Sequence, residues 1–299
     1  MTNRSNDQIF TRTRPMLMGL AYRILGSHHD AEDVVQDVYE TWLTKAADDT
    51  IQKPENWLAL ACSRKAIDRL RARKRQRETY PGEWLPEPVR TDQEESAEHQ
   101  ILLSESLTTA FLLVLEKLTP KERAAYLLRD VFQTDYQDIA DLLAIEATTC
   151  RQLVSRARKR LTLERDHKAP PPQQQKQLVS AFHQAITDGN LDGLRSLLAA
   201  DVSLYADAGG KATSISKPVF GAKAVGKFFD KVLLPIWQES NGILADIELN
   251  GQPGLTLHID GKLDSAITFA FDSNRQVEGI FIIRNPDKLA RLDRTVPLT

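Results

Sequence analysis

Apolar residues recur at helical spacing through the first half of the chain. Residues 9–25, 29–44 and 55–77 each carry an apolar stripe on one side and polar residues on the other. The stripe of the second segment consists of Ala31, Val34, Val35, Val38 and Trp42. Gly26-Ser27 ends the first segment, and a loop at 45–54 precedes the third. The pattern predicts three amphipathic helices that pack through their apolar faces.

Two short helices with a tight turn between them are predicted from Thr119 to Leu161. Thr119 begins a capping box that Glu122 completes, and Thr134 with Gln137 repeats this start signal. The second helix, at 147–161, turns Cys150, Leu153, Val154, Ala157 and Leu161 inward and Arg151, Gln152, Ser155, Arg156 and Lys159 outward. Such a pair is typical of a helix-turn-helix that reads the DNA major groove. The alternative is a helical bundle with a solvated basic face.

The periodicity changes after the Pro- and Gln-rich stretch at 169–175. Residues 176–188 and 190–199 are predicted to be helical, residues 202–205 to begin a strand, and residues 223–236 to form a helix. Strands are predicted at 243–249, 255–259, 266–271 and 277–283, separated by Gly, Asn and Asp. Helices followed by a strand meander indicate an α+β domain with a curved sheet. The chain is therefore expected to be multidomain, with two all-α domains followed by an α+β domain.

Composition places the chain among globular proteins. Its 299 residues fit two or three domains, and its hydrophobic content of 41% and charged content of 27% are ordinary. Two cysteines, Cys62 and Cys150, provide neither a disulfide framework nor a zinc cluster. The first ten residues have no apolar signal core, and no apolar run is long enough to span a bilayer. We expect a cytoplasmic protein that binds no metal and needs no cofactor.

The net charge of −2 is unevenly distributed. Residues 60–80 carry eight basic side chains against two acidic ones, whereas residues 81–105 are strongly acidic. The segment at 24–44 has no lysine or arginine, so its helix presents a single-sign acidic face. Basic patches can neutralise phosphates, and an acidic helix face can dock on a basic partner or simply be solvated.

Two blocks of residues resemble bacterial sigma factors of the extracytoplasmic-function type. Asp30-Ala31-Glu32-Asp33, Trp57-Leu58 and Ala66-Ile67-Asp68 are similar to their region 2, and Leu118-Thr119-Pro120, Ile139-Ala140 and Arg156-Ala157-Arg158 to their region 4. The blocks occur in the same order and together cover residues 7–165. The resemblance implies a promoter-specificity subunit, not an enzyme. Its implied partners are core RNA polymerase, through the β′ clamp helices and the β flap, and promoter DNA.

The resemblance also assigns roles to individual residues. Polymerase binding is implied for Asp30, Glu32, Asp33, Gln36 and Asp37. DNA binding is implied for Arg64, Lys65, Arg69, Arg71 and Arg73 near the −10 element, and for Arg151, Gln152, Ser155, Arg156 and Lys159 at the −35 element. In one departure, Ala144 stands where the family usually has Gly, and Glu146 where it has a Ser or Thr cap. Thr148 or Thr149 could cap a helix that starts later.

The linker and the C-terminal part resemble one subgroup of these factors. Trp84-Leu85-Pro86-Glu87-Pro88 is similar to a signature of the sigma-J-like subgroup, which carries an additional SnoaL-like (NTF2-like) domain. A regulatory role is implied for Trp84, Leu85, Pro86, Asp207, Gly209, Gly210, Lys211, Asn285, Pro286, Asp287, Lys288 and Leu289. Ala208 replaces a glycine of the usual loop motif and would be strained if that position requires positive φ. Trp84 could instead cover local core.

The predicted domains are 1–79 (region 2), an acidic linker at 80–97, 98–165 (region 4), a second linker at 166–175 and 176–299.

Two alternative functions are considered for the last domain, residues 176–299. It could regulate the sigma factor through contacts with the rest of the chain. It could instead bind an unknown small ligand or act as an isomerase or cyclase, with Asp207, Lys211, His258 and Trp237 lining a pocket and Asp207 as general base. A turn residue that bonds its own backbone is the simpler interpretation of Asp207.

Overall fold

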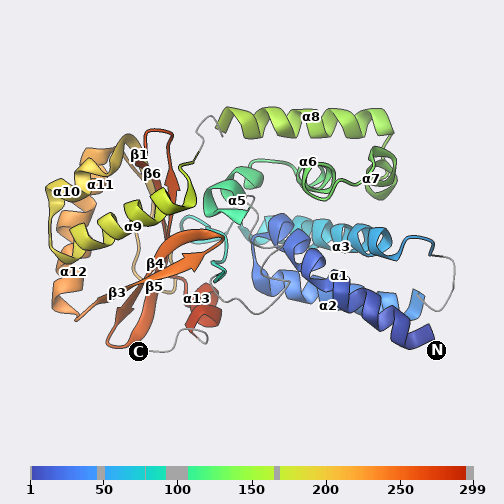
Figure 1. Ribbon diagram of the computed structural model, residues 1–299, viewed down its shortest axis with the longest axis horizontal. Helices are drawn as coiled ribbons and strands as arrows, with labels where there is room; N and C mark the ends of the chain where they lie inside the picture. The colour runs from blue at the N-terminus through green and yellow to red at the C-terminus, as the bar shows by residue number, and fades with distance from the viewer. Residues whose placement is uncertain (1, 46–50, 78, 92–106, 165–168, 294–299) are drawn as a thin grey trace. The chain divides into compact units, whose positions relative to one another are not determined.

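A computed structural model describes residues 2–45, 51–77, 79–91, 107–164 and 169–293 of the chain. These residues form two compact units (Figure 1). The helical unit combines Met1–Glu78, Glu94–Ser104 and Leu112–Asp166, and the sheet unit combines Thr79–Gln93, Glu105–Phe111 and His167–Thr299. The inter-region linker at 79–93 thus clusters with the C-terminal domain.

The helical unit begins with the three predicted helices. They are α1 (Thr2–Leu25), α2 (His28–Lys45) and α3 (Pro54–Arg77). The predicted stripe of α2 is buried, and its Trp42 ring lies 5.6 Å from that of Trp57 on α3. The apolar pattern therefore placed these helices correctly, and α1 extends further toward the N-terminus than its stripe indicated.

The second half of the unit contains the predicted helix-turn-helix. Its elements are the part of α5 (Thr109–Glu116) from Leu112 onward, α6 (Pro120–Tyr126), a π-helical turn η3 (Leu127–Val131), α7 (Tyr136–Leu143) and α8 (Ala147–Glu164). Thr119 caps α6 through the predicted capping box with Glu122. The second start signal was wrong, because Asp135 rather than Thr134 is the N-cap of α7 and Thr134 is buried. Helix α8 starts at Ala147, where the Cys150 amide donates to the Glu146 carbonyl, so Thr148 and Thr149 lie within its first turn.

The turn between α7 and α8 depends on Ala144. This residue has φ 50° and ψ 58°, a left-handed conformation that costs an alanine about 1–2 kcal/mol. The amide of Ile145 donates to the Ala140 carbonyl at 3.0 Å, which closes the end of α7. The turn therefore has the geometry that glycine favours, although the sequence supplies alanine.

Replacing Ala144 by glycine is expected to raise the free energy of unfolding by about 1 kcal/mol, because glycine adopts the left-handed conformation without steric cost. Urea denaturation of the full chain measures this change. Ala72→Gly, at an exposed interior position of α3, is the matched control and should lower stability by about 1 kcal/mol. A loss of stability in both variants would contradict the interpretation of the turn.

Polar contacts join the two halves of the helical unit. Arg123 on α6 is 2% exposed, and its Nη1 donates to the Ile24 carbonyl at 2.7 Å and to Glu116 Oε1 at 2.9 Å. Asn56 Nδ2 on α3 donates to Asp138 Oδ2 on α7 at 2.9 Å. Because a buried guanidinium is costly unless it is paired, Arg123 favours a fixed packing of α6 against the end of α1.

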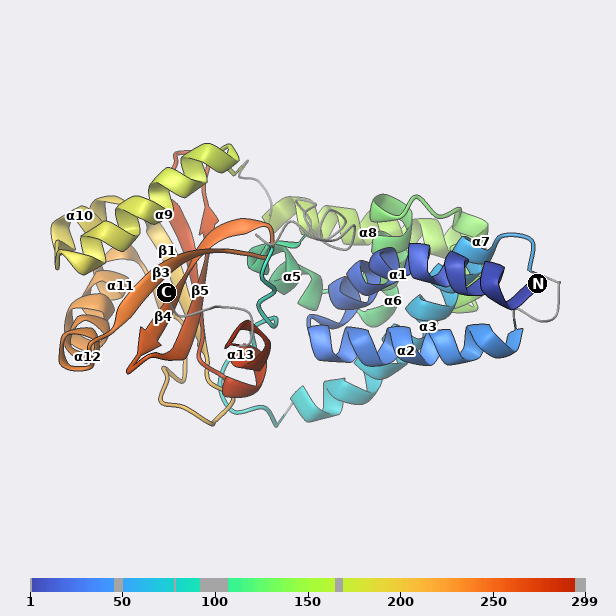
Figure 2. The same ribbon diagram turned by 60° about the horizontal axis from the view of Figure 1, so that its bottom comes forward.

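The sheet unit consists of a six-stranded sheet and helices (Figure 2). In the sequence, two helices precede β1, a helical stretch lies between β2 and β3, and one helix follows β6. Its helical elements are α9 (Pro172–Thr187), α10 (Leu191–Ser196), α11 (Ala222–Phe228), η4 (Phe229–Leu233), α12 (Leu234–Glu239) and α13 (Pro286–Asp293). The strands are β1 (Leu198–Asp207), β2 (Val219–Phe220), β3 (Ile243–Leu249), β4 (Gln252–Ile259), β5 (Lys262–Phe271) and β6 (Val277–Ile283). Their order is β2-β1-β6-β5-β4-β3, with β1 and β6 parallel and every other pair antiparallel.

The predicted α+β architecture is confirmed, with changes at the element ends. Helix α9 starts at Pro172, so residues 172–175 of the predicted linker belong to it. The helix expected at 190–199 ends at Ser196 because Leu198 already begins β1. The helix expected at 223–236 contains the π-helical turn η4. No helix in the described ranges combines the length and apolar character that crossing a membrane requires.

Alternate strand residues face two different environments. On one face, Leu204, Leu257 and Phe269 pack with the helices, and the Phe182 ring lies 4.9 Å from Phe269 and 5.5 Å from Phe229. The opposite face carries buried polar side chains, which include Asp207, Thr256 and Thr268. Buried polar groups require hydrogen-bond partners, so this second face is where a bound polar segment is expected.

Candidate functional site

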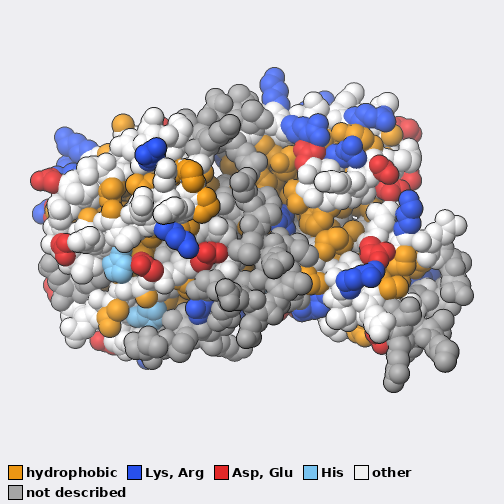
Figure 3. All heavy atoms as spheres, in the orientation of Figure 1, with side chains coloured by type: hydrophobic (Ala, Val, Ile, Leu, Met, Phe, Trp, Pro, Cys, Tyr) orange, Lys and Arg blue, Asp and Glu red, His pale blue; other side chains and the backbone are white. Residues whose placement is uncertain are grey.

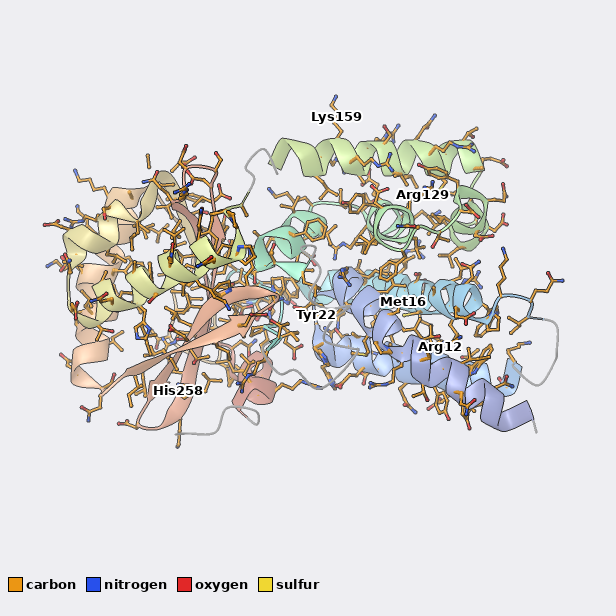
Figure 4. The ribbon with its side chains drawn as sticks, viewed as in Figure 1. Arg12, Met16, Tyr22, Arg129, Lys159 and His258 are labelled. Atoms are coloured by element: carbon orange, nitrogen blue, oxygen red, sulfur yellow. The ribbon has the colours of Figure 1, made fainter. Side chains whose placement is uncertain are left out.

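The outer side of α8 is a basic surface. All five residues predicted to face outward, Arg151, Gln152, Ser155, Arg156 and Lys159, are exposed. Figure 3 shows Lys and Arg side chains gathered over this helix, and Figure 4 shows Lys159 pointing away from it. Of the five residues predicted to face inward, Cys150, Val154, Ala157 and Leu161 are buried and Leu153 is half-buried.

Two further arginines of α8 are held by carboxylates of the preceding elements. Arg158 binds Asp130 through Nε at 2.8 Å and Nη2 at 2.6 Å, and this hydrogen bonding raises the pKa of Arg158 above its ordinary value. Arg160 Nη1 lies 2.9 Å from Glu122 Oε2. Arg158 follows Arg151 by seven residues and Arg160 follows Arg156 by four, so these two ion pairs lie at the two edges of the exposed surface of α8 and tie it to the preceding elements.

Tyr136, the first residue of α7, lies among arginines from two other elements. The guanidinium carbon of Arg129 on η3 is 4.5 Å from the centre of the Tyr136 ring, and that of Arg151 on α8 is 5.3 Å away. The Arg129 Nη1 also donates to the Thr134 carbonyl at 3.0 Å. These distances are typical of cation–π contacts.

The basic half of α3 is partly neutralised within the unit. Arg69 donates to Asp30 Oδ1 at 3.0 Å and to Asp33 Oδ2 at 2.6 Å, and Arg73 also pairs with Asp30. Arg64 and Arg71 are exposed and Lys65 is half-buried. Of the five predicted DNA-binding residues of α3, Arg64 and Arg71 thus face solvent most directly, and Arg71 pairs with the exposed Asp68 at 3.1 Å.

Asp30 does not lie on the acidic face to which the prediction assigned it. It is fully buried, because it shares the inner stripe of α2 with Val34 and Val38 at intervals of four residues. Its carboxylate is compensated by Arg69 and Arg73, as a buried charge requires. Of the other predicted polymerase-binding residues, Gln36 and Asp37 are exposed and Glu32 and Asp33 are half-buried.

In the sheet unit, the linker segment (residues 79–91) is bound at Asp207. This residue is fully buried at the end of β1. Its Oδ1 accepts from the Tyr80 hydroxyl at 2.6 Å and from the Gly209 amide at 3.0 Å, and its Oδ2 accepts from the Leu85 amide at 2.8 Å and from Lys288 Nζ at 2.5 Å. Burial and the bond to Asp207 raise the pKa of Tyr80 above its ordinary value. One carboxylate therefore joins the linker segment to the last helix.

Only some of the residues predicted to be regulatory lie around this carboxylate. Lys288 Nζ lies 4.3 Å from the centre of the Trp84 ring and also donates to the Leu85 carbonyl, and Asn285 Nδ2 donates to the Tyr80 hydroxyl at 2.9 Å. Leu85, Pro86, Asn285 and Leu289 are buried, whereas Lys211, Pro286 and Asp287 are exposed. Lys211 and Asp287 pair with each other at 2.5 Å.

Glycine is needed in the loop at 209 and 210 for close approach of the linker segment. Both residues have positive φ, 58° and 71°. A Cβ atom at Gly209 would lie 2.3 Å from Asn285 Nδ2, and one at Gly210 would lie 2.7 Å from Pro81 Cγ. Ala208 is not among the residues with positive φ, so its substitution for the usual glycine causes no strain there.

A second attachment of the linker, at Asn250, was missed in the sequence. Asn250 is 2% exposed and has φ 55°. Its amide donates to the Val89 carbonyl at 2.8 Å, its Oδ1 accepts from the Val89 amide at 2.9 Å, and its Nδ2 donates to the Leu107 carbonyl at 3.1 Å. Arg90 forms a β-bridge with Leu249. The Asn250-Gly251 turn between two strands was visible in the sequence, but nothing there indicated these distant partners.

Asp207 and Lys211, two of the four residues proposed to line an enzymatic pocket, are engaged by other residues of the chain. Asp207 is occupied by four donors, and Lys211 is exposed beside Asp287. His258 lies on β4 (Figure 4), opposite Ile243 of β3. The side chain of Trp237 lies outside the described residues. Among the described residues, no group of three His, Cys, Asp or Glu side chains is arranged to hold a metal ion. This geometry does not favour Asp207 as a general base.

Comparison with known proteins gives a consistent result along the chain. Residues 9–76 match the family model for Sigma-70 region 2, and residues 108–161 match that for Sigma-70, region 4. The ECF RNA polymerase sigma factor SigJ of Mycobacterium tuberculosis is 33% identical over 290 residues, which cover 93% of this chain and 91% of that protein. The probable ECF RNA polymerase sigma factor SigI of the same organism is 27% identical over 278 residues, with 92% of each chain covered.

A solved structure has the same overall architecture. The crystal structure of the M. tuberculosis extracytoplasmic function sigma factor SigJ matches with a TM-score of 0.76 and 31% sequence identity, and the match covers 95% of this chain and 98% of that chain. The match extends over both helical regions and the C-terminal sheet. It confirms the predicted fold class of two all-α regions followed by an α+β domain.

Proposed function

Because the chain belongs to the extracytoplasmic-function (ECF) family of RNA polymerase sigma factors, which direct promoter-specific transcription initiation, we propose specific roles for its surfaces. The outer side of α8 reads the −35 element, and the basic side of α3 acts at the −10 element. The acidic side of α2 docks on the polymerase. The α+β domain regulates this activity through the linker segment.

The −35 role is carried by the exposed side of α8. Arg151, Gln152, Ser155, Arg156 and Lys159 follow one another along one side of the helix. Arginine and glutamine can each form two hydrogen bonds to a base edge, whereas Lys159 is suited to a phosphate. The ion pairs of Arg158 and Arg160 lie at the two edges of this surface and do not involve its five residues.

At the −10 element, we propose that Arg64, Lys65 and Arg71 contact the DNA backbone. Arg69 and Arg73 pair with Asp30 in the free chain. They would contact DNA only if a DNA phosphate replaced Asp30 as their partner. The polymerase role rests on the single-sign side of α2, where Gln36 and Asp37 are exposed beside Glu32 and Asp33. These residues would dock on the β′ clamp helices, while region 4 would contact the β flap.

The domain organisation implies that the free chain binds promoters weakly and gains selectivity on core polymerase. The test compares binding to a duplex selected by the holoenzyme with binding to the same duplex with a scrambled −35 element, with and without core enzyme. Asp37→Lys should weaken core binding, and Glu239→Lys, an exposed substitution on α12, should not. Equal promoter affinity and selectivity in both conditions would refute this proposal.

The regulatory role is supported by the four hydrogen bonds to Asp207. Tyr80, Leu85 and Lys288 reach this one carboxylate from the linker segment and from α13. Since the linker segment connects the two DNA-reading regions, its attachment limits how those regions can separate. A coupling of about 1–3 kcal/mol would change the affinity for the promoter roughly 5- to 150-fold.

A further inference from the structure

We propose that Tyr136 is a positioning residue for promoter recognition, because it holds the guanidinium groups of Arg129 and Arg151 against its ring before DNA binds. This inference rests on the proposed −35 role of α8. It assigns a function to a residue of α7 that does not itself lie on the recognition helix. It also adds Arg129, on η3, to the DNA-contacting surface.

The geometry of the helix-turn-helix brings the three side chains together. Tyr136 begins α7, directly after the N-cap residue Asp135, while Arg151 lies in the second turn of α8. The Arg129 guanidinium carbon lies 4.5 Å from the ring centre and the Arg151 carbon 5.3 Å from it. Tyr136 also contributes to the raised pKa of Arg158, after Asp130. One aromatic ring therefore contacts arginines from η3 and α8.

The charges around this cluster leave it basic. Arg158 is neutralised by the two close hydrogen bonds to Asp130. Asp135 is 3.9 Å from Arg129 but 83% exposed, so this pair is strongly screened by solvent. Among the described residues, nearby carboxylates therefore do not neutralise the positive charges of Arg129 and Arg151, which can attract an anion. Their position beside the exposed side of α8 makes the DNA backbone or a base edge the expected anion or acceptor.

Positioning matters because arginine is long and flexible. A free guanidinium loses rotamer freedom when it forms a bidentate contact, and a ring that already holds it reduces that loss. A guanidinium that stacks on an aromatic ring by its flat face keeps the N–H groups at its edge available. Tyr136 thereby restricts Arg151 without consuming the donors that would read a base.

Substitution of the ring separates this role from simple packing. Tyr136→Leu keeps an apolar side chain but removes the aromatic face, whereas Tyr136→Phe keeps the face and removes the hydroxyl. The full chain in complex with core polymerase would be tested on the selected duplex and on the duplex with a scrambled −35 element. Tyr136→Leu should lower the ratio of the two affinities about two- to fivefold, the range expected for an exposed cation–π contact. Tyr136→Phe should retain the wild-type ratio.

Two matched variants identify the cause of any change. Gln137→Ala alters an exposed neighbour on α7 and should leave the ratio unchanged. Arg151→Ala should lower the ratio at least as much as Tyr136→Leu, and combining the two should add little. If Arg151→Ala lowers the ratio while Tyr136→Leu does not, the positioning role is refuted and the −35 role of α8 stands. If Arg151→Ala has no effect on the ratio, the proposed reading by Arg151 fails and the positioning role fails with it.

Discussion

Replacing Asp207 by alanine is expected to release the linker segment and to lower the free energy of unfolding of the sheet unit by about 3–5 kcal/mol. That magnitude is typical of removing one partner from a buried charge pair. Lys288, whose side chain is only 12% exposed, would lose its carboxylate, and the Tyr80 hydroxyl and the Leu85 amide would lose their acceptor. Chemical denaturation of the full chain measures the stability, and limited proteolysis within residues 79–91 measures release of the linker segment.

The matched control is Lys211→Ala in the same loop. Lys211 and Asp287 form an ion pair whose side chains are 52% and 64% exposed, so its loss should cost no more than about 1 kcal/mol. Proteolysis of the linker segment should not increase in this variant. Equal effects of the two substitutions would show that the buried carboxylate has no special role in holding the linker segment.

Removal of the residues after 168 is expected to lower transcription from a cognate promoter about tenfold. The linker segment would lose its partners at Asp207 and Asn250, and the buried side chain of Leu85 would become exposed. A freed linker lowers the effective concentration of one DNA-reading region when the other is already bound. Run-off transcription with core polymerase, at matched protein levels, measures the change. Unchanged output would remove the regulatory role, and increased output would reverse its sign.

A cleavable chain distinguishes lost contacts from a lost covalent connection. A protease site inserted after residue 168 would allow the sheet unit to be cut from the rest of the chain without being removed. If the hydrogen bonds of the linker segment are sufficient, the two pieces should co-purify and transcription should stay near that of the intact chain. In the Asp207→Ala background, the cut pieces should separate. Separation of the cut wild-type pieces would contradict a strong linker attachment.

The local features of the fold could be predicted from sequence because they depend on neighbours a few residues apart. The buried stripe of α2, the capping box at Thr119 and the inner side of α8 all follow helical periodicity. The predicted bounds of β3 and β6 match those observed. The error at Thr134 has a local cause, since two neighbouring residues, Thr134 and Asp135, are both of types found at N-caps and the helix begins after the second of them.

Long-range partners could not be predicted in this way. Asp30 has the polarity of a surface residue, and only its counter-charges on α3 explain its burial. Asn250 resembles an ordinary turn residue, although it binds backbone groups of Val89 and Leu107, more than 140 residues away. The sequence motif around Asp207 implied a regulatory role for this residue. Its hydrogen-bond partners Tyr80 and Leu85 could be identified only from the structure.

The contacts of Asn250 also affect how a change in the length of the stretch between Val89 and Leu107 would act on the chain. It holds Val89 and Leu107 together, so the two ends of the intervening stretch are fixed at one side chain whatever path that stretch takes. Lengthening or shortening the stretch would then leave the separation of its anchored ends unchanged, and the entropic cost of a longer loop grows only slowly with its length. An insertion between these two residues is therefore expected to leave Val89 and Leu107 bound to Asn250.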